Sequence, residues 1–140
     1  MNKKVWITFI VVFIVYFLLG WLVNEVLLAS TYQLLPAGMM RPPDVIMSNL
    51  WIIAVSHLFY AFFFTFIFSK GFENKGWMEG VRFGLYVGLM VSVPMAYIAY
   101  ATQPIPYSLA FQWFIYGTLS NVIIGIVAAL VYKPKASATV

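Results

Sequence analysis

Four long apolar stretches, separated by short polar segments, make up most of the chain. Each is long enough for the roughly 20 helical residues, rising about 1.5 Å each, that cross a hydrocarbon core of ~30 Å. None alternates apolar and polar residues as the strands of a membrane barrel do. The pattern therefore predicts an all-α integral membrane protein, with a single membrane domain over residues 1–140. Its approximate transmembrane helices cover residues 5–29, 49–69, 77–101 and 108–132.

The polar segments between these stretches are short. They predict outer loops over residues 30–48 and 102–107, an inner loop over 70–76 and a frayed tail over 134–140. Prolines interrupt the first loop, so we expect an irregular loop or a short interfacial helix there. Short connections place consecutive helices side by side in opposite directions. We therefore expect an up-down antiparallel bundle of four transmembrane helices.

Composition strengthens the membrane prediction. Hydrophobic residues make up 64% of the chain and charged residues 9%, against roughly 45–50% and about 25% in soluble domains. So few charges cannot solvate the surface of a globular protein, whereas a bundle in lipid needs charges only at its two rims. The lipid bilayer is therefore the expected surrounding.

Lysine and arginine are distributed unequally among the connections. They gather at the N-terminus, around the inner loop and after the fourth stretch, whereas Arg41 alone stands in the other connections. Cytoplasmic connections of membrane proteins carry the excess of positive charge. Both termini are therefore predicted to be cytoplasmic, in a bacterial inner membrane. This topology accounts for the net charge of +4, so no nucleic-acid partner is indicated.

Small residues recur along the third and fourth stretches. Every fourth residue from Gly80 to Gly88 is a glycine, and a four-residue step turns a helix by about 400°, which places these glycines on one stripe. Such stripes let two membrane helices approach closely. We predict that the third and fourth helices pack through them, with a contact to a partner subunit or a second copy as the alternative. The packing residues are Gly80, Gly84, Gly88, Gly117 and Gly125.

Several polar side chains fall near the predicted middle of the membrane. An imidazole or carboxamide left unpaired in hydrocarbon costs on the order of several kcal/mol, so these side chains should turn inward and gather. Within such a cluster His57 has three roles open to it: fixing helix register, handling a proton or ligand, and ligating a haem or pigment. The sequence requires no cofactor. The candidate cluster comprises His57, Ser92, Asn121 and Tyr16.

Glu25 lies near the outer end of the first stretch, where water still reaches a carboxylate. We expect it at the outer rim, where it meets Arg41 or Tyr100. In size the chain resembles the small four-helix antiporters that export drugs, which carry one membrane carboxylate on the first helix. The carboxylate of those antiporters lies deeper and in a different helix pattern, so the resemblance transfers no residue.

A short spacing is shared by the first and fourth stretches. Gly20 precedes Asn24 by four residues, and Gly117 precedes Asn121 by the same number. Two matches in so apolar a chain are slight evidence for an inverted repeat of the kind found in transporters.

No known catalytic motif is present. The chain has no cysteine and one histidine, which excludes thiol chemistry and a multi-histidine metal centre within one copy. It also lacks a phosphate-binding glycine loop and a nucleophile elbow. We therefore expect a protein that is not an enzyme, and assign no catalytic or metal-binding residue.

Two functional hypotheses follow. Short loops and abundant apolar surface favour an accessory or scaffold subunit, packed against other membrane subunits or against itself as a homo-oligomer. The alternative is a small transporter, or a membrane protein that binds a ligand or cofactor at a midplane polar site around His57.

Overall fold

The computed structural model describes residues 2–133, so the tail expected over 134–140 lies outside the described residues. Most of the described residues are helical, and no strand occurs among them. Four helical segments, Lys3–Leu27, Leu50–Lys70, Trp77–Thr102 and Tyr107–Tyr132, are long and apolar enough to cross a membrane. This confirms the all-helical prediction. The elements in order are α1 (Lys3–Trp21), η1 (Leu22–Leu27), α2 (Ala29–Tyr32), α3 (Pro43–Ser48), α4 (Leu50–Lys70), α5 (Trp77–Thr102) and α6 (Tyr107–Tyr132).

Local sequence explains where several helices begin. Asn2 caps α1, because its side-chain oxygen accepts a hydrogen bond from the backbone N–H of Lys4 at 3.4 Å. The short helix α3 begins at Pro43, whose fixed φ suits a first helical position. The outer end of the first span differs from a regular α-helix. There η1 is a π-helix, and the backbone N–H of Leu28 donates to the carbonyl of Val23 at 2.9 Å.

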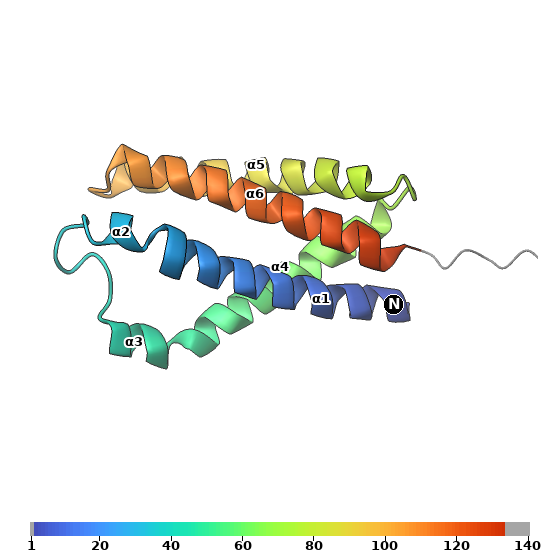
Figure 1. The fold of residues 1–140 in the computed structure, drawn as a ribbon, viewed down its shortest axis with the longest axis horizontal. Coiled ribbons are helices and arrows are strands. Elements are labelled where there is room, and N and C mark those ends of the chain that lie inside the picture. Colours follow the sequence, from blue (N-terminus) through green and yellow to red (C-terminus); the bar gives the residue numbers. More distant parts are fainter. Residues whose placement is uncertain (1, 134–140) are drawn as a thin grey trace, which may run out of the picture.

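The long helices run in alternating directions and pack unequally (Figure 1). The closest pair is α5 and α6, which form a hairpin closed by the turn at Gln103–Pro106. Helix α1 packs against both α4 and α6. Helix α4 crosses behind α1 and leans away from it toward α3, so the bundle is closed at one end and open at the other (Figure 1).

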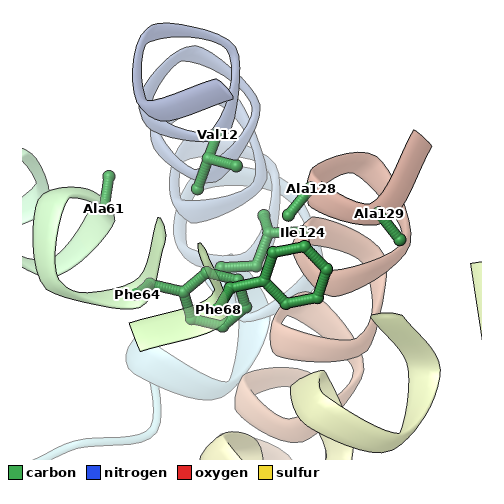
Figure 2. Close-up of a cluster of buried hydrophobic side chains, with 7 residues drawn as sticks. All are labelled: Val12, Ala61, Phe64, Phe68, Ile124, Ala128 and Ala129. Atoms are coloured by element: carbon green, nitrogen blue, oxygen red, sulfur yellow. The ribbon is translucent and has the colours of Figure 1, made fainter. Parts of the chain in front are cut away.

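The main hydrophobic core lies in the closed half. Val12 of α1 meets α4 and α6 there, and Figure 2 shows Phe64 and Phe68 reaching under Ile124. Phe83 of α5 joins them, with its ring centroid 4.9 Å from that of Phe64. Large aromatic rings and small residues alternate across this contact. They fill the space between the helices where the helix axes lie at different distances. The buried members are Val12, Ala61, Phe64, Phe68, Ile124, Ala128 and Ala129.

One buried carboxylate organises the inner connection. Glu79, only 6% exposed, accepts hydrogen bonds from the backbone N–H groups of Glu73 at 2.6 Å and Lys75 at 2.8 Å. Two backbone donors that would otherwise lack partners are thus satisfied. In the exposed part of the same loop, the side chain of Lys75 pairs with Glu73, which holds the pKa of that carboxyl below its usual value.

Candidate functional site

The glycine stripes lie where α5 meets α6. A methyl group on Gly80 would overlap the backbone of Gly125, and one on Gly84 would overlap the backbone at Asn121. At Gly88 the nearest atom, the Cα of Thr118, would be 3.0 Å away. These contacts are between backbones, which explains why no side chain larger than hydrogen stands there.

Asn121 lies beside this contact and is buried. Its amide nitrogen donates to the carbonyl of Gly117 at 2.8 Å, one turn earlier in α6. Its side-chain oxygen accepts a short hydrogen bond from the hydroxyl of Tyr60 on α4. A polar link thus joins α4 to α6 inside an otherwise apolar contact, and both groups at its ends are paired.

His57 lies on the same face of α4 as Tyr60. Its Nδ1 is 2.8 Å from the carbonyl oxygen of Ile53, and a carbonyl can only accept, so Nδ1 carries the proton in the neutral ring. Nε2 is then left as an acceptor. It faces Gly20 of α1, where an added methyl group would come within 3.0 Å of it.

Tyr16 of α1 connects the two polar positions. Its ring centroid lies 4.9 Å from that of His57 and 4.7 Å from that of Tyr60, against which it stacks. The sequence reasoning missed Tyr60 and expected direct pairing among the midplane residues. The structure instead places them along a path from His57 through Tyr16 and Tyr60 to Asn121.

Ser92 lies apart from His57. It is 2% exposed and packs against Gly117, whose missing side chain leaves room for the serine hydroxyl. Ser92 therefore belongs to the contact between α5 and α6. Of the predicted cluster of four, His57, Tyr16 and Asn121 are joined through Tyr60, and Ser92 alone lies off that path.

A second polar network, which the sequence analysis did not identify, lies toward the open end. The indole N–H of Trp113 donates to the hydroxyl of Tyr32 at 3.0 Å, and that hydroxyl donates to the side-chain oxygen of Asn24 at 2.6 Å. The amide nitrogen of Asn24 donates to the carbonyl of Gly20 at 2.8 Å. The network ties η1 and α2 to α6.

The shared Gly-x-x-x-Asn spacing marks these two networks. In both, the asparagine amide donates to the carbonyl of the glycine four residues earlier, at 2.8 Å. In both, the asparagine oxygen accepts a hydrogen bond from a tyrosine hydroxyl of another element. The local bond fixes the amide orientation, so the oxygen is presented to the tyrosine. The spacing was therefore the signal that could have located the second network.

A cavity of about 510 Å³ lies between these networks. All four long helical segments contribute to its wall, and so does Tyr32 of α2. We call it the bundle cavity. Its volume falls in the range of roughly 300–1,000 Å³ that is usual for ligand pockets. Residues in its wall include Tyr16, His57, Met95, Trp113, Tyr116 and Ser120.

A larger groove of about 1000 Å³ lies between η1, α2, α3 and α4 at the open end. We call it the outer groove. His57 borders it as well as the bundle cavity, as do Gly20, Asn24 and Tyr32. Glu25 and Arg41 both line the groove but form no ion pair within residues 2–133. Of the two partners expected for Glu25, Arg41 therefore lines the same groove without an ion pair, and Tyr100 lies on α5 with its ring against that of Tyr107.

Tyr32 keeps its proton at this junction. Burial raises the pKa of its hydroxyl, and the negative charge of Glu25 acts in the same direction, while the hydrogen bond from Trp113 opposes them. The hydroxyl therefore remains a donor to Asn24 well into alkaline conditions.

Comparison with known proteins gives no further guide to the site, because no protein family, curated protein or solved structure matches the chain. Within the part of the chain that the structure describes, no three acidic or histidine side chains gather as metal ligands. The chemistry of the two cavities is therefore the basis for a functional proposal.

Proposed function

We propose that this chain is an integral protein of the bacterial inner membrane that binds a small, mainly apolar molecule inside its helical bundle, without catalysing a reaction. Both termini are cytoplasmic in this proposal. The N-terminus and the inner connection, which carry most of the basic residues, lie at the closed end of the bundle (Figure 1). Arg41 lines the groove at the open end. Such an asymmetry of positive charge supports the orientation.

The bundle cavity is the observation that supports ligand binding most directly. The cavity opens to the outside of the bundle, so a molecule dissolved in the bilayer can enter it. All four long segments border it, which supports a position for an occupant. The aromatic rings of Tyr16, Trp113 and Tyr116 in its wall suit an apolar or aromatic molecule.

His57 defines what polar group the occupant carries. Since Nδ1 donates to Ile53, Nε2 accepts, and it meets a ligand that has an O–H or N–H donor. A molecule without a donor would leave this acceptor unpaired in an apolar surrounding, at a cost of about 1–3 kcal/mol.

The test compares two probes that differ in this donor. Purified protein in mild detergent is heated with 2-naphthol, which has a hydroxyl, or with 2-methoxynaphthalene, which has none. We expect 2-naphthol to raise the unfolding midpoint more than the ether does. His57→Phe keeps a ring but removes both nitrogens, and should abolish the difference. Equal shifts from both probes in the unmodified protein would refute the proposal, and visible absorbance lost in the variant would identify a haem or pigment as the occupant.

A second candidate function is a subunit of a larger membrane assembly. Every fourth residue on the outward face of α4 is a large exposed apolar side chain, from Trp51 at 65% through Phe59 at 62% to Ile67 at 53%. A continuous apolar stripe on the helix that leans from the bundle supports contact with another subunit or a second copy. Mass measurement in native-like lipid tests it, since a monomer without a co-purifying chain would count against assembly.

A further inference from the structure

The outer groove differs from the bundle cavity in its opening and in its charges. It runs from the first outer loop, at Met39, Met40 and Arg41, down between η1 and α4 to His57. Figure 1 shows α3 and the adjoining half of α4 leaning away from the first helix on this side. The groove therefore extends from the rim of the bundle toward its middle, which is the direction in which a membrane lipid lies.

The upper part of the groove contains two opposite charges that do not neutralise each other. Glu25 and Arg41 both line it, and neither forms an ion pair within residues 2–133. Asp44, the acid nearest to Arg41 in sequence, lies outside the groove wall and is also unpaired there. At a membrane rim a charge is stabilised by water, by a partner or by a lipid headgroup. A ligand that carries both charges satisfies both residues at once.

Much of the groove wall is apolar. Phe17 and Trp21 line the part nearest His57, and Leu50 and Ile53, at the outer start of α4, line the part nearest the loop. Trp21, Leu50 and Ile53 are each more than a third exposed, with Trp21 at 59%. Phe17 and Trp21 belong to α1, and Leu50 and Ile53 belong to α4, so both helices contribute apolar wall to the groove. A hydrocarbon chain is the occupant that such walls match.

We propose that the outer groove holds a phospholipid with a phosphoethanolamine headgroup, its phosphate at Arg41 and its primary ammonium at Glu25, with an acyl chain descending between η1 and α4 toward His57. Arg41 offers a planar fork of donors to the phosphate oxygens. The ammonium offers three N–H donors to the carboxylate. A choline headgroup has no N–H donor, and a glycerol headgroup has no cation, so neither completes both contacts.

This proposal is independent of the ligand proposed for the bundle cavity. The two sites share His57 as a border, but headgroup selection rests on Glu25 and Arg41 alone. A His57→Phe variant should therefore lose its discrimination between the naphthalene probes and keep its lipid preference. Failure of one proposal is thereby distinguishable from failure of the other.

The experiment is a lipid competition. The full chain is delipidated and incubated with equal amounts of phosphatidylethanolamine, phosphatidylcholine and phosphatidylglycerol of identical acyl chains, and bound lipid is counted by native mass spectrometry. We expect phosphatidylethanolamine to be retained about tenfold over the other two, as the loss of one charge-assisted hydrogen bond predicts. Equal retention, or preference for phosphatidylglycerol, would overturn the proposal.

Two variants and two matched controls locate the selection. Glu25→Gln should lose the preference for ethanolamine over choline, and Arg41→Gln should lower retention of all three lipids. Asp44→Asn removes an acid of the same outer region that does not line the groove, and Arg82→Gln removes a base at the opposite end. Both controls should behave as the unmodified chain does. The proposal would also be overturned if both Glu25→Gln and Arg41→Gln retained the three lipids in the same proportions as the controls do.

Discussion

Individual asparagines in this protein act through a tyrosine on another element. Asn24 and Asn121 each use one side-chain N–H on their own helix and present the oxygen to Tyr32 or Tyr60. An asparagine in hydrocarbon would otherwise face a large desolvation cost. The two pairs therefore fix where η1 and α2 lie relative to each other, and where α4 lies against α6.

Removing the hydroxyl of Tyr60 tests this role. Tyr60→Phe leaves the oxygen of Asn121 buried and unpaired, so we expect the free energy of unfolding in mild detergent to fall by about 0.6–2 kcal/mol. Tyr86→Phe is the matched control, because Tyr86 is 67% exposed on α5. Equal stabilities of the two variants would show that the hydrogen bond contributes nothing.

Single residues also show how far the sequence could lead. From composition and position alone, His57 and Asn121 were predicted to lie inside the membrane. The sequence did not reveal which side chains they contact. The Nδ1 of His57 donates to the carbonyl of Ile53 in its own helix. That N–H is therefore not available to the other side chains of the expected cluster. Tyr60 is one of nine tyrosines, and nothing in its neighbours distinguishes it, because the partner that matters comes from a helix far along the chain.

At the scale of elements, the hairpin of α5 and α6 is held by backbone contact. Replacing Gly84 by alanine places a methyl group against the backbone at Asn121, and Gly80→Ala does so at Gly125. Each should destabilise the protein by about 1–3 kcal/mol, with a smaller effect at Gly88, where the nearest atom is 3.0 Å away. Thermal unfolding in detergent measures whether the loss of stability at Gly88 is smaller than at Gly80 and Gly84.

Gly71 supplies the control for this series. It lies in the inner connection, where an added methyl group meets nothing within 4 Å. Gly71→Ala should therefore leave the unfolding midpoint unchanged. The explanation by backbone contact would be wrong if Gly84→Ala were as stable as Gly71→Ala.

The elements differ in how well the sequence anticipated them. A four-residue recurrence of glycine has a single geometric consequence on a helix, so the faces of α5 and α6 could be predicted. The π-helix at Leu22–Leu27 had no such signal, because its residues are as apolar and helix-compatible as those around them. The lean of α4 also escaped prediction, since it depends on how side chains of three helices fill space.

For the whole molecule, the prediction concerns orientation across the membrane. The chain contains no cysteine, so single cysteines can be introduced and labelled. With both termini cytoplasmic, Ala37→Cys in the first outer loop should react with an impermeant maleimide added to intact cells. Lys3→Cys should react only after the cells are opened. Both positions are exposed in the structure, and the reverse labelling pattern would overturn the topology.

The molecule as a whole consists of a closed half and an open half. The core around Phe64 and Phe68 joins α1, α4 and α6 at the closed end, where Phe83 of α5 also packs. At the open end η1, α2 and α6 are joined by hydrogen bonds around Asn24 and by a second buried apolar cluster of Leu28, Ile105, Leu109 and Ala110, whereas α4 borders the two cavities there. Because α4 takes no part in that outer cluster, local opening is expected to be easier at the outer half of α4 than in the closed half.

The π-helical turn sets the phase between the two parts of the first span. A π turn takes up one residue more than an α turn, and one residue corresponds to about 100° of rotation in an α-helix. Before Leu22, Tyr16 and Phe17 lie beside His57 of α4, while the side chains that follow Leu27 are turned as they would be after an insertion. Deleting one codon within residues 22–27 would bring the two parts back into register. Tyr32 would then rotate away from Trp113 while Tyr16 kept its place beside His57, so a chain shorter by a single residue would lose the wall that the two cavities share.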